Sequence, residues 1–225
     1  MAPEICSLVS KCFYEPQGKR LAQGRGEPKG YFEQLAEPFD SEVVWVDTSC
    51  AGKQSYHEKT PDRSCANQYE ARAVIDVLRH VLQNEQFTND LVIDLKQGEI
   101  PIGIIAMYRA QVTRINNAIA RAEWLGPLRS LIKVDTVDGY QGKENRIVIL
   151  SLVRHNAKYE QGFLSSPNRL NVAMSRAMDR LVIIGAMRMW KDRNTESPLG
   201  GFVRSFEEAR GEKRVRHVTA ESLKN

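Results

Sequence analysis

Residues 132–150, which read IKVDTVDGYQGKENRIVIL, decide the fold of this chain. Two short runs rich in β-branched residues, 132–135 and 147–150, flank a stretch of glycines, acids and amides. A short apolar run bounded by turn-forming residues is typical of a strand whose two faces are both buried. The stretch therefore predicts two strands of one buried sheet, joined by a polar connection.

Three more runs of the same kind lie outside this stretch, at residues 43–47, 102–106 and 181–184. Because all five runs are short and mostly apolar, they predict neighbouring strands of one sheet rather than an amphipathic layer. The polar segments that follow the 102–106 and 132–135 strands would then lie where ligands bind in such sheets, at the carboxyl ends of the strands.

Helical patterns alternate with these strands. The clearest follows Asn67, which has the spacing of an N-cap residue, with Glu70 as a variant of the capping-box acid. Two more helices are predicted around residues 112–119 and 170–178. Strands and helices in alternation predict an α/β domain with a mainly parallel sheet.

The composition sets wide limits on function. The 225 residues are 42% hydrophobic and 27% charged, as expected of an ordinary globular chain, with no apolar run long enough for a membrane and no signal sequence. We therefore expect a cytoplasmic protein with no membrane partner. The 4 cysteines and 4 histidines lack zinc-ligand spacing, which predicts free thiols and no metal site. The net charge of +4 is compatible with a polyanionic partner but does not require one.

A phosphate-binding loop of the type G-x-x-x-x-G-K-[ST] is missing. The Gly-Lys pairs begin at Gly18, Gly52 and Gly142, and none is followed by Ser or Thr. The run 91–94 resembles a strand that ends in a magnesium-binding acid, but no second acid follows Asp94. We therefore expect that the chain does not hydrolyse ATP efficiently by itself.

Three polar segments nevertheless follow or precede the predicted strands: GIIAMYRAQV (103–112), VDTVDGYQGKE (134–144) and NRLNVAMSRA (168–177). In order and spacing they resemble motifs IV, V and VI of superfamily 1B helicases, in the branch that contains the nonsense-mediated-decay helicase. That family reads approximately P-Y-R-x-Q, T-V-D-x-x-Q-G-x-E and R-R-L-N-V-A-x-[ST]-R-A. The chain departs from it at Ala106-Met107, where Thr-Pro is usual, and at Asn168, where a second Arg is common.

The resemblance covers residues 5 to about 185 and implies a three-layer RecA-like P-loop-hydrolase fold that lacks the phosphate-binding loop. It assigns residues 1–206 to the second RecA-like domain of a helicase, and leaves 207–225 as a charged C-terminal tail, predicted to be a surface helix or partly disordered. The opening residues resemble the segment that follows a Q-Y-R in the family, so we expect a domain excised from a larger helicase.

The resemblance also implies site residues. For catalysis it implies Arg176, as an arginine finger. For nucleotide binding it implies Gln141, Gly142, Glu144 and Arg176. For a single-strand track it implies Tyr108, Arg109, Gln111, Thr136 and Asp138. ATP and Mg²⁺ would be bound by the full-length protein and not tightly by this chain alone. The expected partners are single-stranded DNA or RNA and the first RecA-like domain of the same parent chain.

Other interpretations of these residues stay open at this point. Arg176 could be paired on a helix face, Glu144 could be a solvated acid, and Tyr108 could simply pack after its strand. Arg169 is predicted to form an ion pair that orients the motif VI helix, while Arg154 and His155 are weaker track candidates. The whole chain could be a degenerate module that binds nucleic acid or protein without catalysis. A dinucleotide oxidoreductase is disfavoured because no G-x-G-x-x-G follows a strand.

Overall fold

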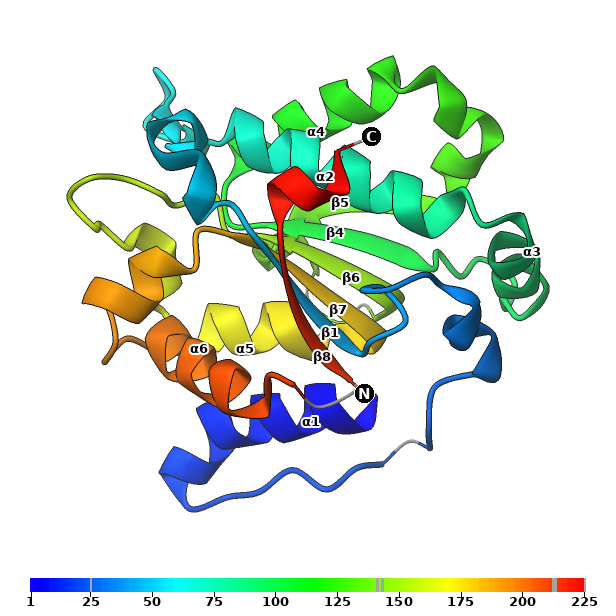
Figure 1. The fold of residues 1–225 in the computed structure, drawn as a ribbon, viewed down its shortest axis with the longest axis horizontal. Coiled ribbons are helices and arrows are strands. Elements are labelled where there is room, and N and C mark those ends of the chain that lie inside the picture. Colours follow the sequence, from blue (N-terminus) through cyan, green and yellow to red (C-terminus); the bar gives the residue numbers. More distant parts are fainter. Residues whose placement is uncertain (25, 141, 143, 212–213, 225) are drawn as a thin grey trace.

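A parallel six-stranded sheet lies between two layers of helices in the computed structural model (Figure 1), which describes residues 1–24, 26–140, 142, 144–211 and 214–224. The strands are β1 (Val43–Asp47), β4 (Ile102–Ala106), β5 (Ile132–Thr136), β6 (Asn145–Ser151), β7 (Ala177–Gly185) and β8 (Val215–Thr219). Their order across the sheet is β5-β4-β6-β7-β1-β8, and every neighbouring pair is parallel. The five predicted strands and the mainly parallel sheet are confirmed, and the fold is RecA-like.

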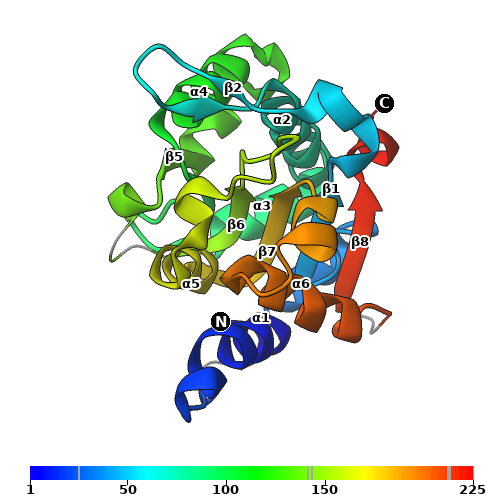
Figure 2. The same cartoon turned by 90° about the vertical axis from the view of Figure 1, so that its left-hand side faces the viewer.

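The two helical layers cover opposite faces of the sheet (Figure 2). One layer contains α1 (Pro3–Val9), α5 (Pro167–Ser175) and α6 (Pro198–Ala209), and the other α2 (Gln68–Leu82), α3 (Glu85–Ile93) and α4 (Arg109–Arg121). Short helical turns are η1 (Ser10–Tyr14), η2 (Glu15–Gln17), η3 (Gly30–Gln34), η4 (Ser49–Ser55), η5 (Glu123–Leu131), η6 (Asp138–Tyr140), η7 (Gly162–Ser165), η8 (Met189–Arg193) and η9 (Ala220–Leu223). A separate antiparallel hairpin pairs β2 (Glu58–Lys59) with β3 (Cys65–Ala66). Among the described residues, no helix is both long enough and apolar enough to span a bilayer.

Each face of the sheet has its own hydrophobic core, because successive side chains of a strand point to opposite faces. On β1, Val43 and Trp45 belong to the core under α1, α5 and α6, whereas Val44 and Val46 belong to the core under α2 and α4. The indole of Trp45 also donates to the carbonyl of Gly185 at 2.9 Å. Two buried faces explain why the strands are continuous apolar runs rather than alternating ones.

Asn67 caps α2 as predicted, but the capping-box role of Glu70 is wrong. The Asn67 Oδ1 accepts from the backbone N–H of Glu70 at 3.0 Å. The N–H of Asn67 donates instead to Gln111 Oε1 at 2.7 Å, and the Glu70 carboxylate accepts from groups at the end of β6. A tertiary partner, Gln111 of α4, has replaced the local one.

Two local predictions are corrected. The helix expected over 170–178 is α5, which ends at Ser175, and Met178 lies in β7, where its carbonyl accepts from the N–H of Ala2 at 2.7 Å. The run 91–94, weighed as a strand end, lies at the end of α3, with Asp94 as its C-cap and in an ion pair with Arg146 at 3.2 Å. A short apolar run is compatible with a helix or with a strand, so tertiary packing decides which of the two forms.

The tail predicted over 207–225 is also wrong. Helix α6 continues to Ala209, and residues 215–219 form β8, which pairs in parallel with β1. Val215 is fully buried, and η9 then packs its Leu223 into the core beside α2. Strand β8 lies at the edge of the sheet, where one side of a strand faces solvent and few apolar side chains are needed. Its sequence is therefore charged, and no apolar run indicated a strand.

We predict that Val215→Ala lowers the free energy of unfolding by about 2 kcal/mol, from the two lost methyl groups and the cavity that they leave. Glu208→Ala, an exposed change on the neighbouring helix α6, should change it by less than about 0.5 kcal/mol. Urea unfolding followed by circular dichroism measures both. Equal stabilities of the two variants would contradict a structural role for β8.

Candidate functional site

The predicted site residues fall at two opposite ends of the sheet. Because all strands run the same way, one end of the sheet holds their carboxyl termini and the other their amino termini. Arg109 and Thr136 follow or end strands, whereas Glu144 directly precedes β6 and Arg176 directly precedes β7. The expectation that the segment after the 132–135 strand lies at the carboxyl end is therefore corrected for Glu144, and Arg176 lies at the amino end as well.

At the amino end, Arg176 caps the C-terminus of α5 and is half-buried. Its Nε donates to the carbonyl of Val172 at 3.2 Å, and its own carbonyl accepts from the N–H of Asn145 at 3.0 Å. The second bond ties the start of β6, and with it Glu144, to the end of α5. The backbone thereby brings Glu144 and Arg176 to the starts of neighbouring strands.

A cavity of about 260 Å³ opens at this end, lined by Glu144 and Ser175 together with Met1, Cys6 and other small or apolar residues. The exposed carboxylate of Glu144 offers acceptors and the hydroxyl of Ser175 offers a donor and an acceptor. Gly142 has φ +78°, a left-handed conformation that glycine adopts readily. Gln141, which the resemblance also implies for nucleotide binding, lies outside the described residues.

At the carboxyl end, Arg109 and Thr136 lie on neighbouring strand ends. Thr136 is opposite Ala106 in the β5–β4 register, and Arg109 opens α4 three residues after Ala106. Arg109 is exposed, and within the described ranges its guanidinium has no hydrogen bond or ion pair with another side chain. The Thr136 hydroxyl accepts from the N–H of Gly139 at 3.3 Å.

Two predicted track residues, Tyr108 and Gln111, do not reach the surface. Tyr108 is 6% exposed, and its ring stacks on Phe163 with centroids 4.9 Å apart. Burial raises the pKa of Tyr108, and its hydroxyl accepts from the N–H of Phe163 at 3.1 Å. Gln111 is fully buried and bonds to Asn67 and to the Ser151 hydroxyl. The structure therefore assigns both side chains to internal packing rather than to a strand-binding surface.

Asp138 is exposed, but its carboxylate is paired. Arg169 donates to it through Nε and Nη2, both at 3.2 Å, so the predicted ion pair of Arg169 is confirmed. The same guanidinium lies over the ring of Phe163, 4.5 Å from its centroid. A bidentate pair of this kind fixes the start of α5 against the end of β5.

Arg154 and His155 hold the connection between β6 and α5 in place. Arg154 is buried, where its Nε donates to the carbonyl of Glu160 at 3.1 Å and its Nη1 lies 3.1 Å from His57 Nε2. The Nδ1 of His155 lies 2.7 Å from the Ser55 hydroxyl. Burial lowers the pKa of His57 and His155, which favours neutral rings. The contacts of Arg154 and His155 are thus made within the fold.

A buried polar cluster that the sequence did not predict joins α2, α4 and β6. Its centre is Glu70, whose carboxylate accepts from the Ser151 hydroxyl at 2.7 Å and from the N–H of Val153 at 2.8 Å. Gln111 then donates to Ser151 at 3.0 Å. Burial raises the pKa of Glu70 from 4.5 to about 7. The only signal in the sequence was an acid on the apolar side of an amphipathic helix.

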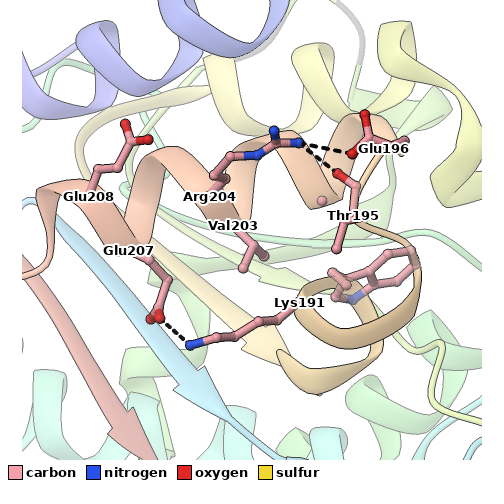
Figure 3. Close-up of a pocket in the computed structure, with 9 residues that line it drawn as sticks. Lys191, Thr195, Glu196, Val203, Arg204, Glu207 and Glu208 are labelled. Carbon is pink, nitrogen blue, oxygen red and sulfur yellow. Dashed lines mark hydrogen bonds and ion pairs between the residues drawn. The ribbon is translucent and has the colours of Figure 1, made fainter.

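A cavity of about 550 Å³ lies between η8 and α6 (Figure 3) and holds none of the predicted site residues. Four of its charged groups are paired with one another: Lys191 pairs with Glu207, and Arg204 pairs with Glu196 at 3.7 Å. Across the described part of the chain, no group of three or more His, Cys, Asp or Glu side chains is arranged to hold a metal ion. The predicted residues therefore remain the candidate site.

A protein-family model described as "AAA domain" matches residues 1–188. The chain belongs to the AAA-domain family. Among curated proteins, this AAA domain is 46% identical over 143 residues to the DNA polymerase alpha-associated DNA helicase A of Saccharomyces cerevisiae, covering 64% of this chain and 19% of that protein. It is 31% identical over 205 residues to the helicase SEN1 of the same yeast, covering 85% of this chain and 8% of that protein.

A third relative is the regulator of nonsense transcripts 1 homolog of Arabidopsis thaliana, 44% identical over 97 residues, which is 40% of this chain and 8% of that protein. The AAA domain thus spans about a fifth or less of the length of these relatives. The resemblance drawn from motifs IV, V and VI is confirmed: the chain is a superfamily 1 helicase domain.

We predict that ionisation of Glu70 destabilises this AAA domain as the pH rises. The pKa of Glu70 in the folded protein, about 7, is above the ordinary value of 4.5. The protonated side chain therefore makes its full contribution to the free energy of unfolding below pH 4.5, and this contribution is lost as the pH rises through 7. Between pH 5 and pH 8 the loss from this one group is about 2 to 3 kcal/mol.

The variant Glu70→Gln cannot ionise at this position and should remove this part of the pH dependence, whatever it does to stability at one pH. Urea unfolding of the parent and the variant at pH 5, 6, 7 and 8 measures it. Parallel curves of stability against pH for the two proteins would mean that the carboxylate is already charged in the folded protein.

Proposed function

We propose that this domain is the C-terminal motor domain of an ATP-dependent nucleic-acid helicase or translocase. In this proposal it supplies an arginine finger, Arg176, and part of a single-strand track that includes Arg109 and Thr136. The observation that supports it most is the placement of α5, which has Arg169 near its start, beside Asp138, and Arg176 at its end, between the starts of β6 and β7. One rigid helix thus spans both candidate regions.

Arg176 is proposed to act on charge. A guanidinium beside a transferring phosphoryl group offsets its developing negative charge, and in nucleotide hydrolases such a finger contributes on the order of 10³- to 10⁵-fold in rate. ATP, when bound, supplies the phosphoryl group whose transfer drives the cycle. The bond from Arg176 Nε to the carbonyl of Val172 orients the side chain from the last turn of α5.

The residues at the amino end of the sheet fit part of a nucleotide. The Glu144 carboxylate can accept hydrogen bonds from ribose hydroxyls, and the cavity that it lines with Ser175 is about 260 Å³. The sequence has no phosphate-binding loop, and no acidic cluster for Mg²⁺ is found among the described residues. We therefore propose that the phosphates and Mg²⁺ are held by a first RecA-like domain, and that this chain alone is inactive.

Arg109 is proposed to bind a phosphate of the strand. A cation on the first residue of a helix opposes the helix dipole, at a cost of about 0.3 to 1 kcal/mol, so its position is not explained by local stability. Arg109 is exposed and follows β4, and Thr136 ends the neighbouring strand β5, so both lie at the carboxyl end of the sheet. A guanidinium and a hydroxyl can both donate to phosphate oxygens. Single-stranded DNA or RNA is the proposed partner.

Alternate closing and opening would move the strand. If Arg176 contacts the γ-phosphate only when the two domains close, ATP favours the closed state and hydrolysis releases it. Helix α5 spans the sheet from one end to the other. If the two domains close at Arg176, the end of the sheet that carries Arg109 and Thr136 would therefore move with it as one body. Each cycle would then shift one domain along the strand.

We predict that Arg176→Ala in the full-length protein lowers kcat for ATP by on the order of 10³-fold or more while nucleic-acid affinity changes little. Arg176→Lys should not restore the rate, because the planar fork is lost. Steady-state ATPase assays and strand-binding assays on the same proteins measure both. Arg204→Ala, an exposed arginine on α6, is the matched control and should keep the parent rate.

The isolated 225-residue chain should show no steady-state ATPase activity in the same assay. If the isolated chain hydrolyses ATP and still does so after Arg176→Ala, the proposal that this chain supplies only part of the ATP site is excluded. A full-length Arg176→Ala protein with the parent rate would favour the non-catalytic alternative, in which the domain only binds nucleic acid or protein.

We predict that Arg109→Ala in the full-length protein weakens single-strand binding alike for all sequences. It should also reduce the slope of log affinity against log salt by about 0.7, one phosphate contact on a single strand. Arg121→Ala, at the opposite end of the same helix, is the control and should leave the slope unchanged. Fluorescence anisotropy of a labelled oligonucleotide at several salt concentrations measures it. Equal slopes for the parent and the Arg109→Ala protein would place the track elsewhere.

A further inference from the structure

Phe163 is one of the large apolar side chains that stay exposed, at 47%. It lies in η7, on the connection between β6 and α5, at the same carboxyl end of the sheet as Arg109 and Thr136. In the order of the sheet, β5, β4 and β6 are neighbours, so Thr136, Arg109 and the connection that carries Phe163 follow three adjacent strands. None of the site residues predicted from the sequence is an aromatic residue of this connection.

The ring of Phe163 is held between two partners. One face stacks on the buried ring of Tyr108, with 17° between the planes, and the Arg169 guanidinium lies 4.5 Å from its centroid. The Phe163 N–H donates to the Tyr108 hydroxyl at 3.1 Å, which fixes the backbone as well as the ring. The buried Tyr108 ring therefore packs against one face of Phe163, whose side chain remains partly exposed to solvent.

The connection is built rigidly around this ring. Gly162 has φ +57°, and a Cβ on it would collide with the Tyr108 hydroxyl and come within 2.9 Å of Arg154 Nε, so only glycine fits there. Asn156 Oδ1 accepts from the N–H groups of Lys158 and Glu160, at 3.1 and 3.0 Å. A preorganised aromatic surface loses little conformational entropy when a ligand stacks on it.

We propose that Phe163 is a base-stacking residue of the single-strand track, and that a base takes the place of the Arg169 guanidinium on its ring. The proposal rests on the proposed function, because it requires that this end of the sheet binds a single strand. Bases of any sequence stack on an aromatic face, whereas a phosphate needs a cation, and Phe163, Arg169 and Arg109 together offer both.

The strengths of the two contacts favour the exchange. An exposed cation–π contact is worth about 2- to 5-fold in an equilibrium constant, whereas stacking of a base on an aromatic side chain is worth about 5- to 150-fold. Arg169, displaced from the ring, stays beside the strand and can pair with a phosphate in place of Asp138. The two contacts that Arg169 gives up, with the ring and with Asp138, are thus replaced by a base stack on Phe163 and a phosphate pair of Arg169.

The test uses the full-length protein and labelled oligo-dT and oligo-U, which separate DNA from RNA as the source of the base. We expect Phe163→Leu, which keeps an apolar side chain against Tyr108, to weaken binding about 5- to 150-fold with little change in the salt slope. Phe163→Trp should retain the parent affinity. Val92→Ala, an equally exposed apolar side chain at 46% on α3, is the matched control and should bind like the parent.

A scan of single abasic sites along the oligonucleotide identifies the contact. One abasic position should weaken the parent and add no further loss to Phe163→Leu, because both changes remove the same contact. Thermal unfolding of each variant checks the fold. Additive losses at every position, or parent-like binding by Phe163→Leu, would overturn this proposal while the Arg109-dependent salt slope still supports the track. Absence of binding by the parent to both oligonucleotides would overturn the proposed function and this inference with it.

Discussion

Parallel pairing of the six strands is the constraint on which the rest of the structure depends. After each strand the chain must return along the whole length of the sheet before it can pair again, so every connection begins at one end and finishes at the other. The polar segment between β5 and β6 therefore leaves Thr136 at one end and delivers Glu144 to the opposite one. Helix α5 does the same between β6 and β7, which separates Arg169 from Arg176. Two surfaces with different chemistry follow from one topological requirement.

The buried cluster around Glu70 holds the elements that carry those surfaces in a fixed arrangement. A carboxylate in a core is costly unless donors surround it, and here the Ser151 hydroxyl and the N–H of Val153 both donate to it. Through Gln111 and Asn67 the same cluster joins the starts of α2 and α4 to the end of β6. The raised pKa of Glu70 shows that burial still outweighs these bonds. The fixed arrangement of three elements therefore comes with a pH-dependent loss of stability.

Tyr108 and Phe163 stack on each other, but one ring is buried and the other is exposed, so only Phe163 can contact a ligand. Both rings lie at the carboxyl end of the sheet, but Tyr108 is the buried N-cap residue of α4, whereas Phe163 lies exposed on the connection between β6 and α5. Arg169 links the pair to Asp138 and so to the end of β5. These contacts tie the loops after three strands to one another, and they place a planar, partly solvated ring at the same end of the sheet as the exposed Arg109.

The sequence by itself determined the five central strands, the α/β class and the helicase relationship, because β-branched runs and motif spacing are local properties of the chain. It also indicated the N-cap at Asn67 and the Arg169 ion pair. Only the tertiary structure decided which side chains are exposed: Gln111 and Tyr108 are buried, and Phe163 is not. It also converted the predicted tail into β8, since the pairing partner of an edge strand is β1, far away in the chain. Solvent exposure and strand pairing depend on residues distant in sequence, so a local pattern cannot specify them.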